Sequence, residues 1–274
     1  MSDTVITFER VSKEFKLSKI PRRSFQDLFV HFFNKDMRGK RHFWALRDVS
    51  FQIKSGETVG ILGINGSGKS TILKLISRII DPTRGTITVS GRLSALLELG
   101  AGFHPDLTGR ENIYLNGSIL GLSRKVMKQK LDSIVAFADI GEFIDVPIRN
   151  YSSGMQMRLG FAVAIHVEPE IILVDEVLAV GDYNFQLKCL ERIRELQQQG
   201  VTILFVSHDF DAVESLCAQA LWLENGTLLA QGSVSDILSR MKGRYRWDGH
   251  QGQAAPGNVV GHKLPRTLLT DQPR

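Results

Sequence analysis

The sequence predicts an α/β fold, a parallel sheet with helices on its faces, and two observations support this. In the second half of the chain, apolar runs typical of buried strands, at 171–174, 201–206 and 220–223, alternate with a polar helical stretch around 185–199. In the first half, the apolar run 58–62 enters a glycine-rich turn, and a helical pattern follows it. Strands that alternate with helices in this way form parallel sheets.

The first elements are short strands around one helix. We expect strands at residues 5–8, 46–53, 58–62, 86–89 and 93–97. The helix expected over 71–80 carries apolar residues at helical spacing, and the turn residues from Asp81 to Gly85 end it.

The middle and the end of the chain differ in composition. Residues from about 108 to 166 have a mostly helical pattern, which predicts a helical subdomain. After Met241 the composition turns to Gly, Gln, Pro and Arg with few apolar clusters, which predicts a basic, disordered tail over 241–274. We therefore expect one domain over residues 1–240.

Residues 17–44 interrupt the strand pattern and form an apparent insert. Within it, large apolar side chains fall on one helical face, at Phe25, Leu28, Phe29, Phe32 and Phe33. This stripe can pack on its own domain. Alternatively, it forms an interfacial helix at a membrane surface or against a membrane partner, a boundary that suits aromatic stripes flanked by basic residues.

The bulk composition indicates a globular chain. Its 274 residues, 43% of them hydrophobic, allow one large domain around an ordinary core. No apolar stretch reaches the roughly 20 residues that a membrane helix requires. Charged residues near the start do not fit a secretory signal, so we expect the chain to stay in the cytoplasm. Cys189 and Cys217 are expected to be reduced packing residues.

The net charge of +5 is unevenly distributed. The segment 16–47 carries nine Lys or Arg against two Asp, and the stretch from Arg240 to the end carries seven against two, so the remaining body is acidic. A basic insert and a basic tail on an acidic body favour anionic lipid headgroups or an acidic partner surface. Nucleic acid is a less favoured partner.

A phosphate-binding loop is the strongest motif in the chain. Residues 63–70 match the pattern G-x-x-x-x-G-K-[ST] between an expected strand and an expected helix. Lys69 would neutralise the outer phosphates and the Ser70 hydroxyl would bind Mg²⁺, while backbone N–H groups converge on phosphate oxygens. The nucleotide-binding residues expected here are Gly63, Asn65, Gly66, Ser67, Gly68, Lys69, Ser70 and Thr71.

Two further strands end in candidate catalytic residues. The buried run 171–174 is followed by Asp175, which we assign to the metal, and by Glu176, which we assign as the base for the attacking water. Such acidic pairs often only end a strand, but here a phosphate loop lies upstream. The strand 201–206 is followed by His208, for which we expect contact with the γ-phosphate.

The segment Tyr151-Ser152-Ser153-Gly154-Met155-Gln156 resembles the signature motif of ABC ATPases, usually Leu-Ser-Gly-Gly-Gln. Ser152 and Gly154 match, whereas Tyr151, Ser153 and Met155 depart from it. The resemblance covers roughly residues 5–240. It implies a P-loop NTPase (RecA-like) core with a parallel sheet, an N-terminal antiparallel β subdomain and an inserted helical subdomain, which binds and hydrolyses ATP with Mg²⁺.

The same resemblance implies roles for single residues. Ser152 and Gly154 would contact the γ-phosphate held by the opposite subunit of a head-to-tail homodimer. Asp182 would be the dimer-interface aspartate and His208 the switch histidine. Phe15 would stack on adenine, with Phe43 or Trp44 as competitors. At the position of the family's loop glutamine the chain has Glu98 or Leu99, and Glu98 could still bind Mg²⁺ through water.

The segments 96–103 and 175–182, together with the Tyr-Ser-Ser-Gly-Met motif and the N-terminal insert, are similar to ATPases that export O-antigen, capsule or teichoic acid chains. That resemblance implies a peripheral subunit on the cytoplasmic face of the inner membrane, bound to transmembrane permease subunits and acting indirectly on a lipid-linked polysaccharide. The alternatives are another class of ABC transporter, a non-transport ABC ATPase acting on nucleic acid or ribosomes, and a lipid-surface adaptor with vestigial ATPase.

Overall fold

The computed structural model describes residues 3–17, 41–97, 99–100, 102–175, 181–207 and 210–244. Its strands are β1 (Thr4–Leu17), β2 (Arg41–Lys54), β3 (Thr58–Leu62), β4 (Arg84–Val89), β5 (Leu93–Ala95), β6 (Ile171–Val174), β7 (Thr202–Val206), β8 (Gln219–Glu224) and β9 (Thr227–Ser233). Its helices are α2 (Lys69–Ile76), α3 (Gly109–Ile119), α4 (Arg124–Ala138), α5 (Ser153–His166), α6 (Tyr183–Gln198), α7 (Phe210–Leu216) and α8 (Val234–Arg244), with 3-10 turns η1 (Gly141–Asp145) and η2 (Ile148–Asn150).

The larger sheet confirms the predicted parallel architecture. Within the described residues its strand order is β5-β6-β7-β3-β8-β9, and all neighbours are parallel except β9, which is antiparallel to β8. We did not predict β9. Asn225 and Gly226 join it to β8 with φ angles of 49° and 78°, the two positive values that a type I′ hairpin turn requires.

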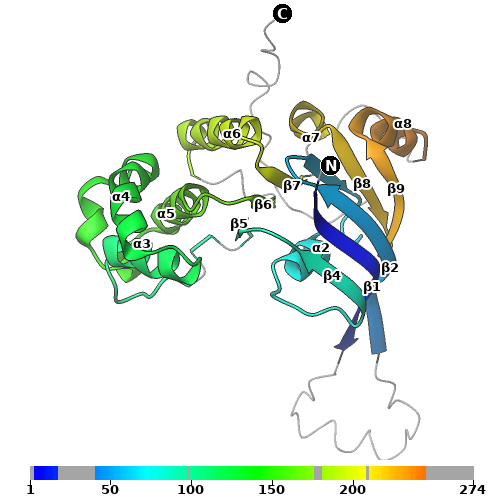
Figure 1. Cartoon of the computed structure of the whole chain (residues 1–274), viewed down its shortest axis with the longest axis horizontal. Helices are drawn as coiled ribbons and strands as arrows, with labels where there is room; N and C mark the ends of the chain where they lie inside the picture. Colours follow the sequence, from blue (N-terminus) through cyan, green and yellow to red (C-terminus); the bar gives the residue numbers. More distant parts are fainter. Residues whose placement is uncertain are drawn as a thin grey trace, which may run out of the picture.

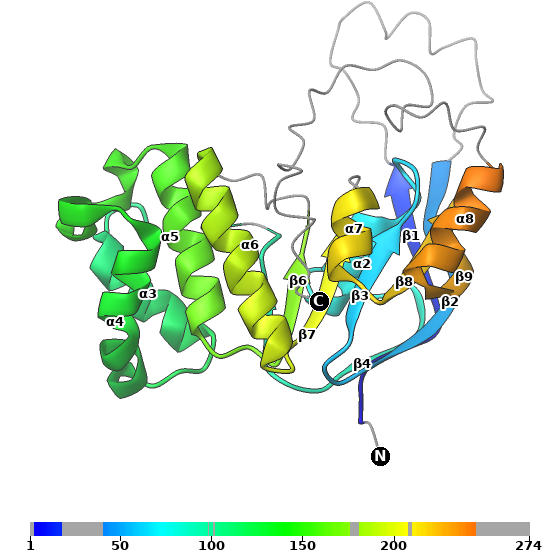
Figure 2. The same cartoon turned by 90° about the horizontal axis from the view of Figure 1, so that it is seen from above.

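Both faces of this sheet are buried, which explains why its strands are continuously apolar. Along β6, Ile172 and Val174 belong to a cluster shared with α5, α6, α7 and α8, whereas Ile171 and Leu173 belong to a second cluster shared with α2 and the N-terminal strands. In Figure 2, α6 and α7 cover one side of the sheet and β1, β2 and β4 lie on the other.

The smaller sheet is antiparallel, in the order β2-β1-β4. Strands β1 and β2 pair along their whole length and run further than predicted, to Leu17 and from Arg41, into both ends of the range given to the insert. Cross-strand aromatic pairing of Phe15 with Phe43 supports this extension. Residues 18–40, which hold the phenylalanine stripe, lie outside the described residues.

A helical lobe made of α3, α4 and α5 stands beside the sheet, at the left of Figure 1. It has its own apolar core, which includes the fully buried Ile113, Met127, Ile134 and Leu159. Its helices fall within the predicted range 108–166. The chain enters the lobe after β5 and returns to the sheet from α5 into β6, so α5 connects the lobe to the sheet.

The last described helix crosses the boundary expected at residue 240. Helix α8 continues to Arg244 because Val234, Ile237, Leu238 and Met241 form one buried face. Residues 245–274 lie outside the described part of the chain. None of the described helices is both long enough and apolar enough to cross a membrane.

The two cysteines are free and buried, as predicted. Burial raises the pKa of the Cys217 thiol to about 12 and also raises that of Cys189. A thiol that remains protonated is neither a nucleophile nor a metal ligand, so both residues serve as packing groups.

Candidate functional site

Three strands of the larger sheet deliver the candidate residues to one edge. Val174 of β6 lies opposite Phe205 of β7, which lies opposite Gly60 of β3, so the three parallel strands run in step. The residues that follow them emerge together at the carboxyl edge: Gly63 after β3, Asp175 after β6 and Ser207 after β7. Ligands of open α/β sheets bind at this edge.

The phosphate loop leads directly into α2, whose N-terminus differs from those of the other long helices. Helices α3, α4, α5 and α6 each begin with a side-chain cap, from Thr108, Ser123, Ser152 and Asp182 respectively. The residue before α2 is Gly68, which has φ 109° and no side chain that could cap the helix. The first-turn N–H groups of α2 are therefore suited to an anion, as in other phosphate sites.

Lys69 is held inside the loop. Its side chain is only 6% exposed, and Nζ donates hydrogen bonds to the carbonyl oxygens of Gly63 (2.8 Å) and Ile64 (3.2 Å). Ser67 is buried next to it, and its Oγ has no hydrogen-bond partner within the described residues. A buried ammonium and a buried hydroxyl lining one loop fit a chain of phosphates, which accepts hydrogen bonds from both.

The remaining loop residues differ in their exposure to solvent. Asn65 and Gly66 are exposed at the tip of the loop, Ser70 is exposed on the first turn of α2, and Thr71 is half-buried. Ser70 and Asp175 therefore follow two different strands of one sheet edge. These are the groups that could hold a magnesium ion, since hydroxyl and carboxylate oxygens are its preferred ligands.

Gly226 clamps the phosphate loop by a backbone hydrogen bond that links it to β2, and no pattern in the sequence indicates this contact. Its N–H donates to the Ser67 carbonyl oxygen (3.1 Å), and its own carbonyl oxygen accepts from the Arg47 N–H (2.7 Å). A Cβ atom on Gly226 would lie 2.6 Å from the Ala45 carbonyl oxygen. The turn between β8 and β9 thus joins β2 to the loop, and only glycine fits there.

Gly226→Ala is expected to weaken ATP binding about tenfold, because the new methyl group must displace β2 or the loop, and small misplacements of binding groups are costly. The measurement is titration calorimetry with ATP, together with the Tm. Gly200→Ala is the matched control: its φ of 80° imposes the same backbone strain, but a Cβ there meets nothing within 4 Å. Equal ATP affinities for the two variants would contradict the clamp.

The signature residues lie on a different part of the molecule. Ser152 is the exposed N-cap of α5, and its Oγ accepts from the Met155 N–H (3.2 Å). Gly154 is half-exposed, and a Cβ there would meet only the Ser152 Oγ, at 3.9 Å. Helix α5 belongs to the helical lobe, whereas α2 lies beside β4, away from that lobe (Figure 1). A single chain therefore presents these two motifs from separate lobes.

Asp182, which was predicted to lie at a dimer interface, has a structural role within its own chain. It caps α6 by accepting from the Phe185 N–H (3.0 Å), and its other oxygen lies 4.0 Å from the Arg158 guanidinium. Arg158 also binds Asp139 (2.9 Å) and lies 4.9 Å above the Phe185 ring. The start of α6 is thereby tied to α5 and α4.

The three aromatic candidates for adenine stacking separate into two groups. Phe15 and Phe43 lie directly opposite each other on β1 and β2 and are 37% and 50% exposed. Lys13 Nζ lies 5.3 Å from the Phe15 ring centroid. Trp44 instead contacts Arg84, whose guanidinium lies 5.6 Å from its ring. Three predicted residues, Glu98, Glu176 and His208, lie outside the described residues.

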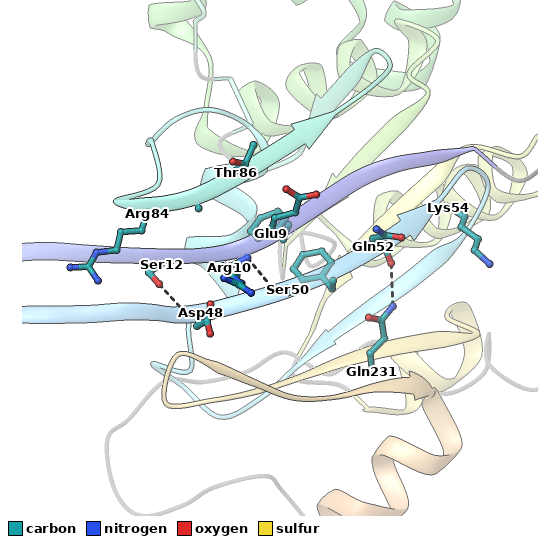
Figure 3. Close-up of a pocket in the computed structure, with 13 residues that line it drawn as sticks. Glu9, Arg10, Ser12, Asp48, Ser50, Gln52, Lys54, Arg84, Thr86 and Gln231 are labelled. Carbon is teal, nitrogen blue, oxygen red and sulfur yellow. Dashed lines mark hydrogen bonds between the residues drawn. The ribbon is translucent and has the colours of Figure 1, made fainter.

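A groove of about 1160 Å³ lies away from the phosphate loop, on the antiparallel sheet (Figure 3). Two facing bulges shape it, at Arg10 and Asp48, both with positive φ. The Arg10 N–H donates to Ser50 Oγ (2.8 Å) and the Asp48 N–H donates to Ser12 Oγ (2.9 Å). None of the predicted site residues that the structure describes lines this groove, and its two hydrogen bonds join the bulged positions of β1 and β2.

Comparison with known proteins identifies the family. The model of the ABC transporter family matches residues 46–179. The O-antigen export system ATP-binding protein RfbB of Klebsiella pneumoniae is 49% identical over 240 residues, 87% of this chain and 97% of that protein. The teichoic acids export ATP-binding protein TagH of Lactiplantibacillus plantarum is 46% identical over 237 residues, which are 86% of this chain and 64% of that protein.

Solved structures show the same fold. An ATP-binding subunit of an ABC transporter superposes with a TM-score of 0.69 at 23% identity, over 87% of this chain and 93% of that one. The dimeric ATP-binding cassette MJ0796 in a post-hydrolysis state bound to ADP and Pi superposes with a TM-score of 0.66 at 22% identity, over 84% and 98% of the two chains. The chain therefore belongs to the ABC transporter family, as an ATP-binding subunit with ATPase activity.

Proposed function

We propose that this chain powers the export of a lipid-linked polysaccharide of the O-antigen, capsule or teichoic-acid type across the cytoplasmic membrane. The observation that carries the proposal is the 49% identity to an O-antigen export ATPase along 97% of that protein's length. A second group of relatives is named for teichoic acid export. These relatives favour an exporter over the ABC ATPases that act on nucleic acid or ribosomes.

The proposal is tested in the producing cell by substituting Glu176 with glutamine on the chromosome. Surface polysaccharide should disappear, and its lipid-linked precursor should accumulate inside the cell. A normal surface glycan, accompanied by loss of transport of another compound, would overturn the proposed substrate class but would leave the ATPase assignment intact.

The nucleotide site is proposed to lie at the carboxyl edge of β3, β6 and β7. Lys69 and the first-turn N–H groups of α2 would bind the phosphates, and Ser70 and Asp175 would hold Mg²⁺, which neutralises phosphate charge when it is bound. Glu176 follows Asp175 directly and is the proposed base. His208 is the proposed γ-phosphate contact, and Glu98 a water-mediated metal ligand. These assignments are supported by the ends of β3, β6 and β7, which lie at one edge of the sheet.

Phe15 is the proposed adenine-stacking residue, with Phe43 as its competitor. Both rings are exposed on adjacent strands, whereas Trp44 is half-buried. The membrane surface and the permease subunits are the proposed partners of the basic insert, and the cytoplasmic face of the inner membrane is the proposed location. The flanking strands β1 and β2 lead to this insert and away from it.

The chain is further proposed to act as a head-to-tail homodimer. Ser152 is exposed and Gly154 half-exposed on the helical lobe, away from α2, where both could meet the nucleotide of a second subunit. Asp182 would lie at the same interface. A composite site of this kind explains why a Cβ on Gly154 would meet only Ser152 Oγ among the described residues.

Gly154→Ala tests the composite site. A Cβ at this position would clash with no described atom, and alanine has a higher helix propensity than glycine. The Tm should therefore stay the same or rise. The ATPase rate should nevertheless fall about 100-fold, since the methyl group would intrude on the partner's γ-phosphate. Steady-state phosphate release and thermal unfolding measure the two effects. An unchanged rate would refute the role given to the signature motif.

A further inference from the structure

Tyr151 is the residue at which the signature motif departs from the usual leucine, and the structure gives it a specific set of contacts. The side chain is 6% exposed. Its hydroxyl donates to the Phe143 carbonyl oxygen in η1 (2.6 Å), and its backbone N–H donates to the Ile148 carbonyl oxygen (2.9 Å). Burial, followed by the nearby charge of Asp145, raises the pKa of the phenol, so the hydroxyl remains a donor.

Gly109 provides the space for this hydroxyl. A Cβ built on Gly109 would lie 2.2 Å from Tyr151 Oη, 3.1 Å from the Ile144 carbonyl oxygen and 3.2 Å from Ile144 Cδ1. Gly109 is the first residue of α3 and is absent from the glycines with positive φ. Glycine is therefore required there for room and not for its backbone conformation, which any residue could adopt.

The anchored ring lies directly before the functional part of the motif. Ser152, the next residue, is the exposed N-cap of α5, and among the described residues a Cβ on Gly154 would meet only Ser152 Oγ. The orientation of these two residues thus depends on how the chain enters α5. Tyr151 sets that entry, because its ring is buried against α3 and bonded to η1 just before the chain reaches the surface.

We propose that Tyr151 is a positioning residue for ATP hydrolysis. Its hydrogen bond to Phe143, in the space left by Gly109, holds Ser152 and Gly154 in the orientation that meets the γ-phosphate of the partner subunit's ATP. This inference rests on the proposed homodimer. Gly109 and Tyr151 form a size-matched pair, in which a hydroxyl on one side requires the absence of a methyl group on the other.

The test is a double-mutant cycle on the purified full chain, with Tyr151→Phe, Gly109→Ala and the double variant. Tyr151→Phe should lower kcat about tenfold, the loss expected for one good hydrogen bond. Gly109→Ala should lower kcat at least as much, because the methyl group displaces the hydroxyl. In the double variant the closest clashing atom is gone, so adding Gly109→Ala to Tyr151→Phe should cost less than about twofold in kcat.

A second readout separates positioning from packing. The affinity for ATP of the isolated subunit, measured at a concentration too low for association, should change less than about twofold in every variant, since the Lys69 site is untouched. Tyr114→Phe and Gly117→Ala are the controls. Both alter α3, and the second crowds Met127 (2.4 Å from the new Cβ to its Sδ) without reaching Tyr151. They should leave kcat unchanged.

Two outcomes would overturn the inference. One is a fall in Tm with an unchanged kcat for Tyr151→Phe and Gly109→Ala, which would leave only a packing role. The other is additive effects of the two substitutions on kcat, which would disprove the size-matched pair. Failure of the homodimer proposal has a different signature, because Gly154→Ala would then hydrolyse ATP at the normal rate.

Discussion

Lys69→Ala is expected to reduce ATP affinity by about 10²- to 10³-fold. Lys69 is almost fully buried, and its ammonium is held by the Gly63 and Ile64 carbonyl oxygens on the inner side of the loop. Truncating one partner of a buried, hydrogen-bonded charge pair costs about 2–5 kcal/mol, most of it because the remaining charge is left unpaired. Here the phosphates of ATP would be the charge left without a partner.

Titration calorimetry with Mg-ATP measures this affinity, and phosphate release measures the accompanying loss of turnover. Lys74→Ala is the control, since Lys74 lies on the same helix, is exposed and has the same charge. It should bind ATP like the wild type. If Lys69→Ala bound ATP within about threefold of the wild-type affinity, the phosphate loop would not be the nucleotide site.

The strand ends that carry the candidate residues could be predicted from the sequence because their signals are local. The glycine-rich loop lies between a strand and a helix, and β6 and β7 are short apolar runs that end in polar residues. Parallel strands bring such ends to one edge by geometry alone, and the register of Val174 with Phe205 and Gly60 bears this out. Because both faces of β6 are buried, its apolar pattern is continuous and not periodic.

The contacts that hold the site in place were not predictable in the same way. Gly226 lies about 160 residues after Ser67 in the sequence. It binds the loop through its backbone, so no pattern of side chains reveals the contact. The Asn225-Gly226 pair was nevertheless a readable hairpin signal. The sequence shows that Tyr151 departs from the usual leucine, but it does not show the contact with Gly109, which arises only when the start of α3 packs against the segment before α5.

Glu176→Gln is expected to lower ATP hydrolysis by about 10²- to 10⁴-fold, the contribution of a general base, while ATP binding is retained. Glutamine keeps the size and hydrogen-bonding capacity of the side chain but cannot take a proton from water. With hydrolysis blocked, ATP-loaded subunits should accumulate as dimers, which size-exclusion chromatography with light scattering would detect.

Glu170→Gln, at the opposite end of β6, is the control and should hydrolyse ATP normally, because Glu170 is exposed and lies 3.8 Å from Arg92. A normal rate for Glu176→Gln would show that another group activates the water, and loss of binding would place Glu176 among the ATP-binding groups instead.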